Sequence, residues 1–187
     1  MLYLSKGMVL KESSKQNLCV TIYGTDHILT GIGAELWLAG RLHVNAASGE
    51  REERHLQKLQ SLGLLEIAYD DGADAHYSLL TRCIICPAQE KTLRRKLSRI
   101  EKQVYQWISS AGLRLTIGEL VKLFDSSITL MPELLGAENA QTLTLAIYSS
   151  DLCFDTVPDI QMSQSPYRDQ VVNAVLGLLR KKRILLT

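Results

Sequence analysis

The chain has 187 residues, of which 46% are apolar and 22% are charged, and its formal net charge is +1. This balance is typical of a folded globular protein and excludes a disordered or fibrous chain. It also excludes a strongly basic protein, so any contact with nucleic acid would depend on local groups of lysine and arginine.

The sequence has no segment that predicts a membrane or an export route. No apolar run reaches the roughly 18 residues that a membrane-spanning helix needs. Lys6 interrupts the apolar start of the chain, where a signal peptide would need an unbroken apolar segment. We therefore expect a cytoplasmic protein that does not contact a membrane.

The four cysteines are too few and too widely spaced for a disulfide-stabilised fold in a chain of this length. Cys83 and Cys86 have the spacing of a metal or redox pair. However, no second pair follows at zinc spacing, and no helix of the thioredoxin type comes next. We interpret both as reduced thiols packed in a strand, and we predict neither a metal nor a cofactor.

The first part of the chain predicts a small β-meander followed by a helix. The runs at Met8–Lys11, Leu18–Tyr23 and Ile28–Leu29 are β-prone and are separated by polar segments. A helix is predicted over residues 30–42, with Thr30 as its cap and Trp37 as its largest buried side chain. Ser48 is then placed to cap the next helix.

A helix that runs directly into a strand occurs twice. Residues 50–62 have leucines at helical spacing, Gly63 ends the helix, and residues 64–69 follow as an apolar strand. Residues 170–186 repeat this order, with basic residues in the last helical turn. The repetition predicts two domains, at residues 1–88 and 89–187.

The first of these junctions leads into a predicted hairpin. Residues 70–74 are acidic, contain glycine and predict a turn, and His76–Ile85 is expected to return as a strand. The order of elements over residues 30–88 resembles the winged-helix family, in which a core of three helices carries a hairpin wing. The fold class that we expect is α+β and mostly helical, with two winged-helix-like domains joined by a long helix.

The second half predicts further helices. The longest helical pattern covers residues 88–111 and is expected to link the domains, Gly112 ends it, and Thr116 begins a shorter helix. Residues 138–150 read as a helix or, less well, as a strand, and residues 151–166 as an irregular loop. The closing helix is predicted from Ser165 and Pro166 to about Lys182. This second domain lacks most of a wing.

No pattern in the sequence predicts catalysis. The four histidines have no metal-binding spacing, and neither a nucleophile elbow nor a complete glycine-rich phosphate loop is present. The acidic residues Asp70, Asp71 and Asp74 are better explained by the turn than by cation binding. We expect a protein that is not an enzyme.

The winged-helix resemblance implies double-stranded DNA as a partner, bound by the third helix of each domain. It also implies a transcriptional regulator, for which a homodimer on paired half-sites is a common assembly. The residues at the equivalent positions, with the neighbouring basic clusters, are Arg51, Arg54, Lys58, Arg94, Arg95, Lys96, Arg99, Arg168, Gln170, Asn173, Arg180, Lys181, Lys182 and Arg183. The acidic wing would repel phosphate and argues against this function.

The alternative is a non-enzymatic adaptor for a peptide or protein partner. A meander followed by the helix at Thr30 and by a helix ending in GLLEI resembles the PqqD-like peptide-recognition domains over about residues 5–67. Those domains bind a peptide as an added strand. The resemblance implies that Val20, Ile22, Tyr23, Arg54 and Lys58 would face the peptide.

Overall fold

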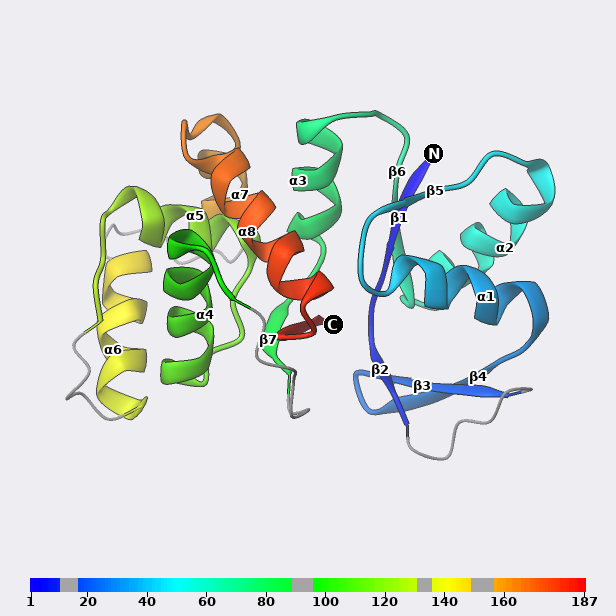
Figure 1. Ribbon diagram of the computed structural model, residues 1–187, viewed down its shortest axis with the longest axis horizontal. Helices are drawn as coiled ribbons and strands as arrows, with labels where there is room; N and C mark the ends of the chain where they lie inside the picture. The colour runs from blue at the N-terminus through cyan, green and yellow to red at the C-terminus, as the bar shows by residue number, and fades with distance from the viewer. Residues whose placement is uncertain (11–16, 89–95, 131–135, 149–156) are drawn as a thin grey trace.

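The structure is a computed structural model that describes residues 1–10, 17–88, 96–130, 136–148 and 157–187 (Figure 1). The fold is α+β, with short strands and a larger helical part. The strands are β1 (Leu2–Ser5), β2 (Met8–Val9), β3 (Leu18–Ile22), β4 (Thr25–Leu29), β5 (Asn45–Ala46), β6 (Leu65–Ala68), β7 (Ile85–Pro87) and β8 (Ile184–Leu186). The helices are α1 (Gly31–Gly40), α2 (Glu50–Ser61), α3 (Ala73–Thr81), α4 (Arg99–Ala111), α5 (Ile117–Asp125), α6 (Gly136–Ile147), α7 (Val157–Gln161), the 3-10 turn η1 (Met162–Gln164) and α8 (Arg168–Arg180).

The predicted meander and the first two helices are confirmed. β2, β3 and β4 form an antiparallel sheet in that order. Thr30 is the cap residue of α1, although its side chain makes no capping hydrogen bond, and Trp37 is fully buried. The cap of α2 is Gly49, one residue after the predicted Ser48, whose backbone N–H instead donates to Glu52 Oε2 at 3.3 Å.

A second sheet, which no sequence pattern predicted, is built around β1. This strand lies between β5 and β6 and is antiparallel to both. Figure 1 shows α1 and α2 on one side of this sheet and α3 on the other. Because both faces are covered, every residue of β6 is buried.

The junction between α2 and β6 confirms the predicted helix stop. Gly63 has a φ of 73°. Its N–H donates to the Gln60 carbonyl at 2.8 Å, and the Leu64 N–H donates to the Leu59 carbonyl at 3.0 Å. This pair of hydrogen bonds is the Schellman motif, in which glycine normally takes the left-handed position.

The junction between α8 and β8 has the same hydrogen bonds. The Lys182 N–H donates to the Leu179 carbonyl and the Arg183 N–H to the Leu178 carbonyl, both at 2.9 Å. Here the left-handed residue is Lys182, with a φ of 56°, where the first junction has Gly63. A residue with a Cβ atom adopts this conformation at a cost of about 1 kcal/mol.

The predicted hairpin after β6 is wrong. Gly72, with a φ of 86°, leads directly into α3, and β6 pairs with β1. Tyr77 and Leu79, which the prediction placed on a returning strand, are buried on this helix together with Ala75, at a spacing that a strand would also show. They are all buried on a helix because α3 is covered by the β1 sheet on one side and by α8 on the other (Figure 1).

In the second half, several helices begin or end at other residues than predicted. Residues 96–98 are not helical, so α4 begins at Arg99 with Ser98 as its cap, and the linking part at 89–95 lies outside the described residues. Gly112 and Thr116 end and begin helices as expected. The predicted helix after Glu138 is present as α6, while the predicted loop contains α7 and η1. The closing helix begins at Arg168, after Ser165 and Pro166.

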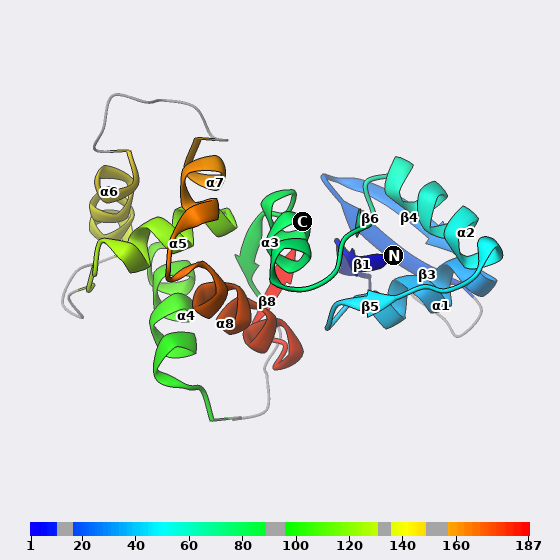
Figure 2. The same ribbon diagram turned by 90° about the horizontal axis from the view of Figure 1, so that it is seen from above.

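β8 pairs with β7 from the first half, in the register Ile85 with Leu186 and Pro87 with Ile184. The backbone of Leu115 extends this pair, since Ile85 and Leu115 exchange hydrogen bonds at 2.8 and 3.2 Å. Figure 2 shows α8 between α3 and α4. The end of the chain is therefore fixed to a segment about a hundred residues earlier in the sequence.

The described residues form two groups of buried apolar side chains. The first core contains residues between Tyr3 and Ile67, around Trp37. The second core contains residues from Ala75 to Leu186, around Trp107, and also includes Leu4 and Ala68 from the β1 sheet. The β1 sheet is thus shared by both cores.

None of the helices in the described segments has the length and apolar composition needed to cross a membrane.

Candidate functional site

The predicted DNA-contacting residues of α2 lie on its outer face. Arg51, Arg54 and Lys58 are all exposed and follow one another at helical spacing. Arg54 makes an exposed ion pair of 3.9 Å with Glu50, one turn earlier. These three cations are therefore accessible to a partner.

The equivalent residues of α8 have mixed surroundings. Gln170 and Asn173 are exposed. Arg168 is half-buried and pairs with the exposed carboxylates of Asp74 at 2.6 Å and Asp169 at 2.8 Å, and its guanidinium lies 5.6 Å from the ring centre of Tyr77. Arg168 therefore fastens α8 to α3 and is not available to a base.

The basic cluster at the end of α8 also contains both residues with partners in the protein and exposed residues. Lys181 donates to both carboxylate oxygens of Glu101 at 2.6 Å, and the Arg183 guanidinium lies 5.8 Å from the ring centre of Tyr105. Arg180 and Lys182 are exposed, as are Lys96 and Arg99 at the start of α4. Arg94 and Arg95 lie outside the described residues.

Glu101 has two structural roles in this cluster. Its carboxylate accepts from the Ser98 N–H at 2.6 Å, and the Glu101 N–H donates to Ser98 Oγ, which completes a capping box. Burial acts to raise the pKa of Glu101, but the hydrogen bonds from Lys181 and Ser98 lower it below its usual value. Glu101 is thus an ionised buried anchor for Lys181.

A second polar cluster holds α7 in place. The Tyr77 hydroxyl donates to the Asp159 carbonyl at 2.6 Å, and the Gly118 N–H donates to Asp159 Oδ1 at 2.7 Å. Burial raises the pKa of Asp159 to about 6, while the Gly118 hydrogen bond acts to lower it. These contacts connect α7 to α3 and α5, and we assign the cluster a structural role.

The residues expected to face a peptide are only partly exposed. Val20 and Ile22 point into the first core and are buried, whereas Tyr23 is exposed in the turn between β3 and β4. The buried face of the meander therefore belongs to the core. A docking site has to be sought elsewhere.

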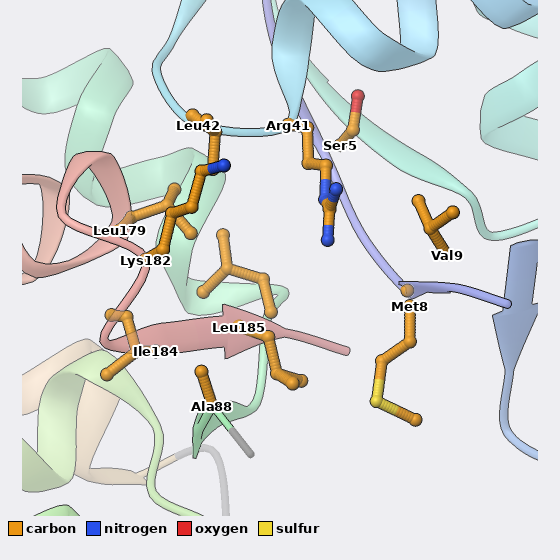
Figure 3. A pocket seen from close by; sticks show the side chains of 12 residues that line it. Ser5, Met8, Val9, Arg41, Leu42, Ala88, Leu179, Lys182, Ile184 and Leu185 are labelled. Carbon is orange, nitrogen blue, oxygen red and sulfur yellow. The ribbon is translucent and has the colours of Figure 1, made fainter. Parts of the chain in front are cut away.

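A cavity of about 410 Å³ lies between the first and second cores (Figure 3). Its walls come from β2 with the end of β1, from Arg41 and Leu42 after α1, and from the end of α8 with β8. Most of the lining side chains are apolar, including Met8 and Leu179. The volume is in the range of pockets that hold small ligands or a short piece of peptide.

One edge of β8 faces away from β7. Ile84 and Thr187 exchange hydrogen bonds of 2.7 and 3.0 Å, and Ala88 donates to Arg183 at 2.9 Å. Since such pairs alternate along an antiparallel ladder, Leu185 is the β8 residue whose N–H and C=O point to β7. The backbone groups of Ile184 and Leu186 point the other way.

This free edge of β8 borders the cavity. The Leu186 carbonyl accepts from the Gly7 N–H at 2.7 Å, and Gly7 and all three residues of β8 line the cavity. Within the described chain, no hydrogen bond engages the Leu186 N–H or the N–H and C=O of Ile184. Leu186 and Ile184 are buried, with exposed fractions of 2% and 3%. These three backbone groups are therefore buried without a hydrogen-bond partner among the described residues.

Two cations reach the cavity from opposite walls. In Figure 3 the Arg41 side chain points towards β8, and the Lys182 side chain rises from the end of α8 towards Leu42. The Arg41 guanidinium lies 5.9 Å from the ring centre of Trp37. Neither Arg41 nor Lys182 makes an ion pair with a residue that the structure describes.

A second hollow, of about 620 Å³, adjoins the cavity, since Met8 and Leu185 line both. It is bordered by the β3–β4 turn around Tyr23, by Pro87 and by Arg114. Arg114 is exposed and has no ion-pair partner among the residues that the structure covers. The two hollows thus lie side by side at β8, with Arg41 and Lys182 in the first and Arg114 in the second.

The sequence singled out Lys182 but not Arg41, Arg114 or the edge of β8. A signal for Lys182 was present, because a lysine stands where the matching junction has Gly63. Arg41 and Arg114 have no such signal. In the described segments, no three histidine, cysteine, aspartate or glutamate side chains gather as metal ligands would.

Comparison with protein-family models, with curated proteins and with solved structures finds no match for this chain.

Proposed function

We propose that this protein is a non-enzymatic adaptor that binds an extended segment of a partner protein as a strand added to β8. The observation that carries the proposal is the free, buried edge of β8 beside the cavity. An added strand would satisfy the N–H of Leu186 and both backbone groups of Ile184. Among the residues that the structure describes, none makes these hydrogen bonds.

The energetics favour a peptide at this place. A buried donor or acceptor without a partner costs about 1–3 kcal/mol, so each backbone hydrogen bond that a peptide supplies recovers part of that cost. The apolar lining around Met8 and Leu179 adds burial of side chains, at about 25 cal/mol per Å² of apolar surface. Main-chain bonds give affinity, and the surrounding hollows give specificity.

A selection from a phage-displayed library of random peptides tests this function, because it works without an identified partner. We expect enriched peptides to bind the wild-type protein and to lose at least about tenfold in affinity on Leu42→Trp, which fills the cavity. Leu38→Trp is the matched control, since Leu38 is an exposed residue of α1 that does not line the cavity. Absence of enrichment, or equal binding to Leu42→Trp, would contradict the proposal.

Duplex DNA is a second candidate partner, in keeping with a tandem winged-helix regulator and its homodimer. The supporting observation is the exposed row of Arg51, Arg54 and Lys58 on α2. Replacing all three by alanine is expected to weaken binding of a mixed-sequence duplex in a fluorescence-polarisation titration, and binding should fall steeply between about 50 and 200 mM salt. Lys102→Ala, an exposed change on α4, is the control; equal binding by the triple variant would exclude this surface.

A further inference from the structure

We infer that the partner segment is acidic, and that one of its aspartate or glutamate side chains lies between Arg41 and Lys182. This inference rests on the proposed function and specifies the chemistry of its ligand. The two side chains enter the cavity from opposite walls, Arg41 after α1 and Lys182 after α8 (Figure 3). A carboxylate placed between them would meet both.

Among the described residues that line the cavity, the charge is one-sided. Arg41 and Lys182 are the charged ones, and these lining residues include no aspartate or glutamate. The adjoining hollow contains Arg114 and, among the described residues, no aspartate or glutamate side chain. Two other lysines of the described chain are paired with carboxylates, Lys181 with Glu101 and Lys6 with Glu66. Arg41, which is half-buried, and Lys182, which is exposed, make no such pair there. Two cations at the cavity, with no carboxylate among its described lining residues, favour an anionic ligand over a cationic one.

The backbone at Lys182 is an independent observation that points the same way. The equivalent position of the α2–β6 junction is Gly63, which adopts the left-handed conformation without strain. Lys182 adopts it with a φ of 56°, although glycine would make the same two hydrogen bonds. A strained residue whose side chain points into a cavity is typical of a functional position.

The two hollows favour an acidic side chain within a segment over a free carboxyl terminus. The cavity and the second hollow meet at Met8 and Leu185, so a segment has room to continue from one into the other. Successive side chains of a strand point to opposite faces, so neighbouring residues of the segment would enter different hollows. One acidic residue would then meet Arg41 and Lys182, and another Arg114.

The experiment uses the full chain and an array of random octapeptides, each made with a blocked amino terminus and either a free or an amidated carboxyl terminus. We expect the binding peptides to be enriched in aspartate and glutamate and to bind equally when amidated. If peptides bind without acidic enrichment, or only with a free carboxylate, the inference is wrong while the proposed function stands. If no peptide binds, the proposed function itself fails.

The variant Lys182→Gly makes the test specific. We expect it to raise the urea midpoint, because the strain is removed, and to weaken binding of the best acidic peptide by about tenfold. The same peptide with glutamine at its acidic positions should bind both proteins equally. Arg180→Gln, which removes an equal charge outside the cavity, is the control. A stabilised Lys182→Gly protein that retains full affinity for the acidic peptide would overturn the inference.

Discussion

Single residues decide how closely the helices of the second core approach one another. Gly177 on α8 lies against Glu101, and a Cβ atom at this position would meet Glu101 Oε1. That carboxylate is buried and binds Lys181, so it has no room to move without losing a hydrogen bond. The absence of a side chain at Gly177 is therefore a requirement of the buried ion pair.

Gly177→Ala should consequently lower the free energy of unfolding by about 2 kcal/mol, because an added methyl group forces Glu101 away from Lys181. Urea denaturation followed by circular dichroism measures this change. Gly33→Ala is the matched control: Gly33 is in α1, and its Cβ would meet no atom within 4 Å. That substitution should stabilise the helix by about 0.5–1 kcal/mol, and equal effects of the two variants would contradict the explanation.

Asp159 gives a prediction about pH. Burial raises its pKa in the folded protein from 3.8 to about 6, so its contribution to stability is complete below the unfolded pKa and is lost as the pH rises through 6. Asp159→Asn keeps an oxygen for the Gly118 N–H but carries no charge. Since the group is partly exposed, we expect a gain of only about 1 kcal/mol at pH 8 and none at pH 4. Urea midpoints at both pH values decide the question, and a loss of stability at pH 8 would refute this explanation.

At the scale of elements, both helix-to-strand junctions were predictable, because glycine and a leucine pattern mark the first and a basic last turn marks the second. The helix α3, where a hairpin strand was expected, could not be predicted in this way. The spacing of Ala75, Tyr77 and Leu79 fits a strand as well as a helix that is covered on more than one side. Tertiary burial decided that segment. The start of α4, in contrast, could have been predicted from Ser98 and Glu101, which have the spacing of a capping box.

The capping box makes an element-scale prediction. Ser98→Ala should remove the hydrogen bond that Ser98 Oγ accepts from the Glu101 N–H at 3.2 Å, and it should cost about 1 kcal/mol of stability. Ser109→Ala is the control on the same helix, because the Ser109 hydroxyl donates only to the Tyr105 carbonyl within the helix. The free energies of unfolding from urea titrations compare the two. A Ser109 variant that loses as much as the Ser98 variant would show that the cap is not the cause.

The candidate site belongs to the scale of the whole molecule, which explains why the sequence could not reveal it. Its lining residues lie within residues 5–9, 41–42 and 179–186, with Ala88 in addition. No local pattern connects these segments. They meet because β7 and β8 pair across the chain and because Gly7 donates to Leu186. Propensity describes neighbours in the sequence, whereas the cavity is a product of the final packing.

The β1 sheet, which contributes to both cores, is relevant to the prediction of two domains with a boundary between residues 88 and 89. Successive residues of β1 enter different cores, Tyr3 the first and Leu4 the second. The buried Lys6 binds Glu66 at 2.7 Å within the β1 sheet and donates to the Arg82 carbonyl after α3 at 3.2 Å. We therefore expect the two cores to unfold together.

Each core contains one tryptophan, which allows a direct test. In a Trp107→Phe background, fluorescence reports on Trp37 in the first core, although Leu4 packs in the second. Leu4→Ala should cost about 3 kcal/mol through the cavity that it creates. If the shared sheet couples the cores, Leu4→Ala lowers the free energy of unfolding by the same amount in both measurements. The urea transition of Trp37 fluorescence and that of the circular-dichroism signal then shift together. If the urea midpoint of Trp37 fluorescence stays the same while that of the circular-dichroism signal falls, the second core loses its structure without the first. This outcome would support two domains that fold independently.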